Sequence, residues 1–255
     1  MAELTRATLA EAVARVERHN ANVAVIDRMW CRMGVRVMWV EGDKQRRESG
    51  EGVLMVRRPG EVALSVGKLG QDGLWAGGDG ERVWLFDLRE GVAWVGAADP
   101  VSGVGTGLPL GIEPGEVPRL LGWSAIDVAD VRRGRVTAIG DRLWIEPRDA
   151  QGRATARYVF DPAVEHPVRI DLLEPDGGSA VTSRLSDAER VTYVGRGVAE
   201  IGADVAIALS DGSSELILRL RDYEPAGERI RDAAFDFERL VRAHRPEEIV
   251  EIDRR

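Results

Sequence analysis

The chain has 255 residues, a formal net charge of −8 at pH 7 and a sequence pI near 5.1. Its apolar fraction of 44% suffices for a substantial core, and its acidic balance argues against a nucleic-acid partner, which would need a basic surface. Cys31 is the single cysteine, so an intrachain disulfide is impossible.

The N-terminal segment predicts a helix over about residues 5–20. Thr8 and Glu11 have the spacing of a capping box, and apolar residues follow at helical intervals. The stretch from Asn20 to Asn22 is expected to end this helix. No stretch reaches the ~20 apolar residues of a membrane span, and residues 1–4 lack the features of an export signal. The chain as given is therefore expected to be soluble.

A run of short strands separated by turns begins near Val35. Alternating apolar and polar residues, broken by glycine-rich or proline-containing turns, are typical of an antiparallel sheet or barrel. In the first strand Val35, Val37 and Trp39 point to one side. The strands predicted in this half are 35–40, 46–57, 62–66, 73–76, 82–87 and 92–95.

An irregular segment at 99–115, rich in glycine and proline, interrupts the strands and is expected to form a flap. A short covering helix at about 116–121 follows, and Gly122 ends it. Further strands are predicted at 128–131, 135–139, 143–147, 156–160, 168–173, 181–185, 190–194, 204–209 and 215–221. A short helix at 232–242 and a strand at 249–252 close the chain. No composition break marks a second domain, so a single domain spanning 1–255 is predicted.

Motifs that carry catalysis or bind metals are not recognisable. The segment 122–126 begins like a nucleophile elbow but lacks the closing glycine and the βα alternation of that fold. His244, Glu247 and Glu248 have metal-like spacing, but Pro246 breaks the helix that would align them. The sequence therefore predicts no catalytic residue, no metal site and no cofactor. The seven tryptophans either pack a core or line an apolar cavity.

Five segments, taken in order, carry a resemblance to a known family. Residues 50–60 form a strand that ends in an Arg-Pro turn, and residues 79–87 form a hairpin strand containing Trp84. Residues 118–122, 166–171 and 235–237 supply a covering helix, a later strand and a C-terminal end. Together they resemble the bacterial lipoprotein carriers of the LolA and LolB type.

This resemblance implies a mainly β fold with a few helices. The sheet would be antiparallel and strongly curved, an unclosed β-barrel, with helices covering its concave face. The implied function is non-enzymatic: binding or transport of lipid or lipoprotein acyl chains in the periplasm or elsewhere in the bacterial cell envelope. The implied partners are those acyl chains and an envelope membrane protein, with the carrier itself a monomer.

An unclosed sheet needs a plug or a ligand on its inner face, whereas a small closed barrel fills itself with side chains. The residues expected to line a lipid-binding face are Val35, Val37, Trp39, Leu54, Val56, Leu64, Val66, Trp84 and Phe86, with Leu120 and Leu121 from the covering helix. Two alternatives stay open. One is a structural or protein-interaction β module with a self-filled core, and the other is an enzyme with an unrecognised site.

Overall fold

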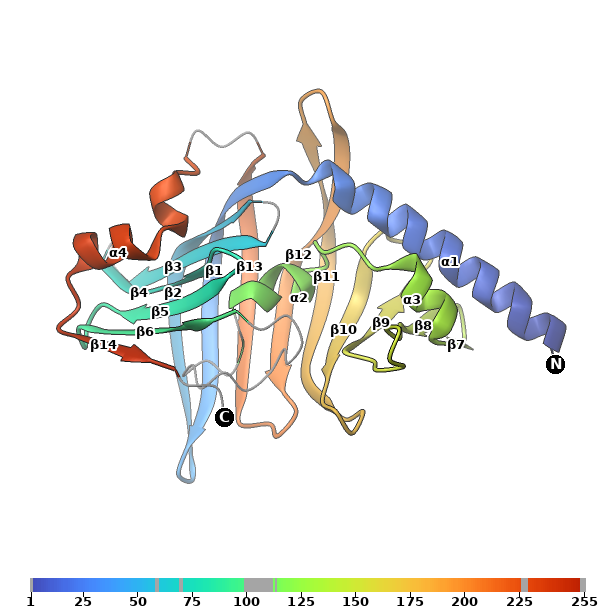
Figure 1. Ribbon diagram of the computed structural model, residues 1–255, viewed down its shortest axis with the longest axis horizontal. Helices are drawn as coiled ribbons and strands as arrows, with labels where there is room; N and C mark the ends of the chain where they lie inside the picture. The colour runs from blue at the N-terminus through green and yellow to red at the C-terminus, as the bar shows by residue number, and fades with distance from the viewer. Residues whose placement is uncertain are drawn as a thin grey trace. The chain divides into compact units, whose positions relative to one another are not determined.

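The computed structural model describes residues 2–57, 60–68, 71–98, 112, 114–225 and 229–252. They form two compact units, each built from two chain segments (Figure 1). Unit 1 comprises Met1–Ile26 and Arg119–Ser213, and unit 2 comprises Asp27–Pro118 and Ser214–Arg255. Most of the predicted flap at 99–115 lies outside the described residues. None of the described helices is long and apolar enough to cross a membrane.

Unit 2 contains a sheet of strands in the order β14-β6-β5-β4-β3-β2-β1-β13. Neighbouring strands are antiparallel, except that β14 runs parallel to β6. The strands are β1 (Arg28–Glu41), β2 (Lys44–Arg57), β3 (Glu61–Lys68), β4 (Gln71–Gly78), β5 (Arg82–Asp87), β6 (Val92–Ala97), β13 (Ser214–Glu224) and β14 (Glu248–Glu251). Its helical elements are η1 (Pro114–Glu116), η2 (Asp232–Phe235) and α4 (Phe237–His244). The chain passes from unit 2 to unit 1 within α2 (Val117–Leu120).

Unit 1 contains strands in the order β12-β11-β10-β9-β8-β7, with antiparallel neighbours. The strands are β7 (Arg135–Ile139), β8 (Arg142–Glu146), β9 (Ala156–Phe160), β10 (Pro167–Leu173), β11 (Ser179–Tyr193) and β12 (Gly197–Leu209). Helix α1 (Ala2–Val25) contacts β12, β7 and α3 (Val128–Arg133). The predicted fold class is confirmed: the protein is mainly β, with an unclosed antiparallel sheet and few helices.

The strands predicted separately at 181–185 and 190–194 are parts of the single strand β11. A further predicted strand is a helix. Residues 128–131 belong to helix α3, not to a strand. The carboxylate of Asp127 caps this helix by accepting a hydrogen bond from the N–H of Ala129, and Gly134 ends it. The apolar residues Val128 and Val131 are three positions apart, so they lie on one side of a helical turn. A stretch this short fits the spacing of a helix as well as the alternation of a strand, and the Asp127 cap favours the helix.

Helix α1 continues to Val25, beyond the end predicted at about residue 20. The two asparagines do not end the helix because their side chains bond to other elements of unit 1. The Asn22 amide donates to the carbonyl of Glu200 in β12 and accepts from the N–H of the same residue, at 2.7 and 2.6 Å. Asn20 makes the same pair of bonds with Ile126, at 2.7 and 2.8 Å. Each side chain thus satisfies a backbone donor and acceptor as a neighbouring strand would.

Replacing Asn22 by alanine should destabilise unit 1. The substitution leaves the N–H and carbonyl of Glu200 without their partner, and the expected loss is about 2 kcal/mol in the free energy of unfolding. Urea denaturation followed by far-UV circular dichroism measures it. Ala21→Ser, at an exposed position in the same helical turn, is the matched control and should change stability by less than about 0.5 kcal/mol.

Unit 1 also buries ionisable side chains between α1 and its sheet. Arg15 and His19 on α1 are 4% and 0% exposed, and His166 is 2% exposed. The Arg15 guanidinium donates to the carbonyl of Asp161, while Nε2 of His19 donates to the carbonyl of Ser124 at 3.0 Å. Burial lowers the pKa of His19 to about 4, although hydrogen bonds with the backbone act in the opposite direction. Burial also lowers the pKa of His166. Both imidazoles are therefore neutral in the folded protein at pH 7.

This burial predicts a loss of stability in mild acid. Between about pH 6.5 and 4 the unfolded chain protonates His19 while the folded chain does not, so the free energy of unfolding falls as pH falls. The contribution is fully present above pH 6.5, and its loss reaches at most about 3 kcal/mol at pH 4. Denaturant titrations across this window measure the slope. His19→Gln keeps a donor for Ser124 but cannot titrate, so its slope should be shallower; an unchanged slope would refute the assignment.

Candidate functional site

The sheet of unit 2 has two apolar faces. Directly paired residues on adjacent strands lie on the same face. The pairs Leu54–Leu64, Leu64–Ala76 and Ala76–Leu85 therefore define one face, here called face A. The pairs Trp75–Phe86 and Gly77–Trp84 define the opposite one, face B.

The structure brings seven of the predicted lining residues together on face A. From β1, β2 and β3 these are Val35, Val37, Trp39, Leu54, Val56, Leu64 and Val66. Trp84 and Phe86 lie on face B instead, while Leu120 and Leu121 belong to unit 1. Alternation predicts which residues of one strand share a face, but only the register between strands decides which face of the sheet that is. Sequence reasoning missed the other apolar residues of face A, which include Met29, Cys31, Met33, Val62, Leu74, Ala76, Val83, Leu85, Trp94, Leu216, Leu218 and Leu220.

Face A presents mainly aliphatic and sulfur-containing side chains, together with Trp39 and Trp94. At the far end of β2 it also carries the exposed Arg46 and Glu48, which pair with Trp39 and Val37. Leu54 and Cys31 are fully buried, whereas Val37, Trp39, Leu64 and Val66 are only half-buried. The paired residues of β3, β4 and β5 on this face include no charged side chain until Asp87, at the end of β5. The part of face A on β3 and β4 therefore makes no directional contacts through its side chains and favours apolar ligands.

Two glycines allow β2 to bend where face A begins. A Cβ atom at Gly52 would lie 1.9 Å from the carbonyl oxygen of Ser65, and one at Gly50 would lie 2.6 Å from that of Gly67. The backbones of β2 and β3 approach too closely there for any side chain. Beyond Gly50, β2 pairs only with β1, as far as the pair Glu41–Lys44. The glycines therefore let the strand leave β3 while keeping its register with β1.

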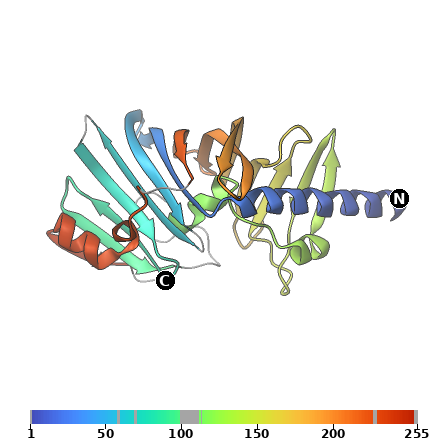
Figure 2. The ribbon, with the colours of Figure 1, turned by 90° about the horizontal axis from the view of Figure 1, so that it is seen from above.

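Face B is covered by the C-terminal segment of the chain (Figure 2). Phe235 in η2 packs in a cluster with Trp30, Met55 and Ala63. Phe237 in α4 packs against Trp84 and Phe86, with ring centroids 6.0 and 5.7 Å apart. The sequence indicated a short C-terminal helix but gave no signal for the face that it covers.

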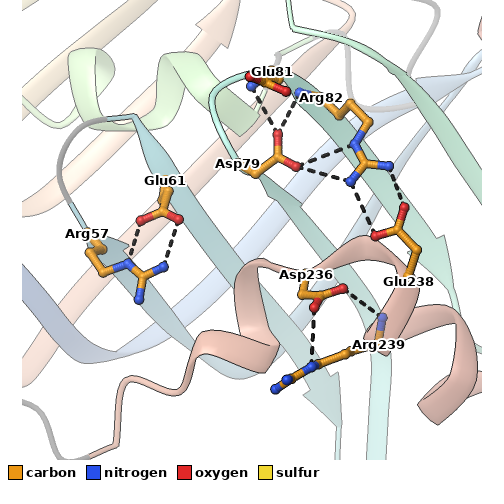
Figure 3. A network of polar contacts seen from close by, with 8 residues as sticks. All are labelled: Arg57, Glu61, Asp79, Glu81, Arg82, Asp236, Glu238 and Arg239. Atoms are coloured by element: carbon orange, nitrogen blue, oxygen red, sulfur yellow. Dashed lines mark hydrogen bonds and ion pairs between the residues drawn. The ribbon is translucent and has the colours of Figure 1, made fainter.

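Arginines at the edge of the sheet form ion pairs near this C-terminal cover (Figure 3). The Arg82 guanidinium bonds to Glu238 of α4 at 2.7 Å and to Asp79 at 3.3 Å, and it lies 5.7 Å from the Phe237 ring. The Arg57 guanidinium bonds to Glu61 and Asp232 and lies 4.9 Å from the ring of Phe235. The hydrogen bond from Arg82 lowers the pKa of Glu238 to about 2.

No group of three or more His, Cys, Asp or Glu side chains able to hold a metal ion occurs in the described part of the chain. His244, which the sequence spacing placed near Glu247 and Glu248, instead packs its ring against Trp75 and Phe86, at 5.7 and 5.8 Å. Pro246 follows the end of α4 and separates His244 from β14.

No protein-family model and no curated protein matches the chain. Solved structures do. A LolA superfamily protein from Nitrosomonas europaea aligns with a TM-score of 0.54 at 11% identity, covering 88% of this chain and 97% of the other. A DUF1329 family protein from Desulfovibrio piger aligns with a TM-score of 0.53 at 12% identity, covering 91% and 98%. The chain has a LolA-like fold.

The resemblance drawn from the sequence is thereby confirmed at the level of the fold. At 11% identity the residues of a LolA-like site cannot be carried over by alignment, so the candidate site rests on the chemistry of face A itself. Its distinguishing property is a largely apolar surface on β1, β2 and β3 that is only half-buried at Val37, Trp39, Leu64 and Val66.

The buried thiol on face A should be unreactive. Burial raises the pKa of Cys31 to about 12, so at pH 8 only about one thiol in ten thousand is ionised. Labelling with an aromatic disulfide reagent should therefore be at least a thousandfold slower in native protein than in urea. Adding an exposed thiol by Ser49→Cys should give one rapid equivalent of labelling. Rapid native labelling of the unsubstituted protein would contradict the burial of Cys31.

Proposed function

We propose that the protein binds acyl chains of lipids or lipoproteins on face A and carries out no chemical step. The observation that supports this is the half-buried apolar surface formed by Val37, Trp39, Leu64 and Val66 in a LolA-like fold. A hydrocarbon chain needs no hydrogen bond, and the side chains of Val37, Leu64 and Val66 offer none.

The energetics favour a long apolar ligand over a short one. Each CH₂ group removed from water contributes roughly 0.8 kcal/mol, so a chain of a dozen carbons gains about 10 kcal/mol before ordering costs. Those costs are several kcal/mol for association and for immobilised rotors. Affinity should therefore rise steadily with chain length, and the ligand's headgroup should matter less.

The same fold supports a place in the cell envelope. Carriers of the LolA type, which the sequence resembles, work in the periplasm, and we propose that location here. The partners would be the acyl chain and an envelope membrane protein that delivers or receives it, with the carrier a monomer.

The alternative is a β module whose face A is filled by its own chain. One observation favours it: Ile252, just beyond β14, packs with Ala76, Val83 and Leu85 on this face. That contact covers the end of face A near β5, whereas the half-buried Val37 and Trp39 lie on β1, outside this cluster. The two functions therefore predict different behaviour at Trp39.

Trp39→Asp should weaken binding of a fluorescent fatty-acid probe at least tenfold. The substitution replaces a large apolar side chain by a small carboxylate on the surface that receives the acyl chain, so the apolar contact of Trp39 is lost even though Arg46 lies opposite on β2. Probe titration monitored by fluorescence measures the dissociation constant, and circular dichroism checks folding.

Met38→Asp is the matched control. Met38 is the adjacent residue of β1, is also half-buried, and points to face B. Probe affinity should be retained in this variant. Equal loss in both variants, or full affinity in a folded Trp39→Asp protein, would rule out face A as the binding surface and leave the self-filled module.

A further inference from the structure

Strand β14 completes face A at one edge of the sheet in unit 2. It runs parallel to β6, and the pair Trp94–Val250 extends a row of directly paired residues on this face. From β3 to β14 the row consists of Leu64, Ala76, Leu85, Trp94 and Val250, so every residue in it is apolar. Val250 is half-buried and ends the row.

Ile252 lies two residues beyond Val250 and therefore points to the same face. Its backbone N–H donates to the carbonyl of Val95 at 2.8 Å, which continues the pairing with β6. A Cβ atom at Gly96 would lie 3.4 Å from the Cβ of Ile252, so the glycine leaves room for the isoleucine side chain. Ile252 thus packs against the cluster that contains the buried Leu85.

The same cluster joins β14 to the surface proposed to receive the acyl chain. Leu64 belongs to that half-buried surface, and both Leu64 and Ile252 pack against the cluster. Adjacent strands are about 4.8 Å apart, so Leu64 on β3 and Trp94 on β6 are separated by about 14 Å. A ligand that extends from Leu64 across β4 and β5 therefore meets Val250 and Ile252.

Strand β14 is weakly attached to the sheet. Glu248, Ile249 and Glu251 are exposed, and among the described residues neither glutamate side chain forms an ion pair or a hydrogen bond. Water can replace the backbone hydrogen bonds of such an edge strand, so it opens at a low free energy. Arg245, with a φ of 49°, and Pro246 end α4 before β14 begins. Detachment of β14 therefore requires no change in the helix that covers face B.

We propose that Val250 and Ile252 set the length of acyl chain that face A accepts with β14 in place: a short chain binds beside β14, and a long chain displaces it from β6. This inference rests on acyl-chain binding at face A. A long chain would take over the apolar contacts that Val250 and Ile252 make with Leu85 and Trp94. Its apparent affinity is reduced by the small fraction of molecules in which β14 is detached.

Hydrogen–deuterium exchange followed by mass spectrometry tests whether β14 leaves. Decanoic acid spans the two strand spacings from β1 to β3, whereas hexadecanoic acid spans about four and reaches β5. Each acid is used at a concentration that fully displaces a fluorescent fatty-acid probe. Hexadecanoic acid should speed exchange of the amides of residues 248–252 at least about fivefold, because they lose their acceptors on β6. Decanoic acid should leave their exchange unchanged, and the amides of β11 in unit 1 are the internal control.

Ile252→Ala tests the competition in the full chain. The smaller side chain weakens the attachment of β14, so hexadecanoic acid should bind at least about fourfold more tightly. The affinity for decanoic acid should stay within about twofold, because that ligand leaves β14 in place. Probe displacement measures both affinities, and circular dichroism checks folding.

Ile249→Ala is the matched control on the same strand. Ile249 pairs with Ala93, which pairs with Phe86, so it points to face B, and it is 46% exposed. The affinity for either acid should change by less than about twofold. Equal gains in Ile249→Ala and Ile252→Ala would show that the face A side chains are not the determinant and would overturn the inference.

Two further outcomes separate this inference from the function on which it rests. Binding of hexadecanoic acid with undiminished protection of residues 248–252, or with unchanged affinity in a folded Ile252→Ala protein, would overturn the role of β14 and leave acyl-chain binding intact. Failure of both acids to bind the unsubstituted protein would refute acyl-chain binding itself, and the role of β14 with it.

Discussion

The sheet of unit 2 is apolar on both faces, and this constraint governs the rest of the unit. An antiparallel sheet commonly has one face exposed to solvent. Here Leu64 and Leu85 lie on face A, and Trp84 and Phe86 lie on face B. Each face must be kept from water by something other than the sheet. The C-terminal segment supplies the cover of face B, and the aliphatic residues of face A are left half-buried along β1 and β3.

Packing, not charge, holds the cover on face B. The buried rings of Phe235 and Phe237 remove large apolar areas from water, and truncating a buried phenylalanine typically costs about 3–5 kcal/mol. The pair of Arg82 with Glu238 is 38% and 57% exposed, and such pairs contribute about 0–1 kcal/mol. The arginines help to orient the cover, because each guanidinium contacts both a carboxylate and the face of a phenylalanine ring. The depressed pKa of Glu238 keeps this arrangement charged across the physiological pH range.

The sequence predicted the parts of the fold that local chemistry decides. Gly80 and Gly177 have positive φ in turns placed correctly, and strand β5 has its predicted bounds. It failed where two periodicities fit one short stretch, and where the outcome depends on distant residues. The helix at Val128–Arg133 depends on the Asp127 cap, and the end of α1 depends on strand β12, which pairs with Asn22 about 180 positions later. Trp84 and Phe86 lie on face B and not on face A as predicted. The alternation within β4 or β5 does not predict the register between them, which is set at the turn that contains Asp79.

The two faces differ in chemistry, and this separates the ligands that each can take. Along the pairs Val62–Gly78, Leu64–Ala76 and Val66–Leu74 face A is apolar, so an ammonium group there would lose its hydration without gaining a carboxylate, at a cost of several kcal/mol. Face B offers no such surface along β5, because Phe237 of α4 packs there against Trp84 and Phe86. The binding that we propose on face A would be graded by the length of the hydrocarbon, because each CH₂ group removed from water contributes separately. The register therefore gives the C-terminal segment one face of the sheet to cover, and it leaves Val37, Trp39, Leu64 and Val66 half-buried on the other.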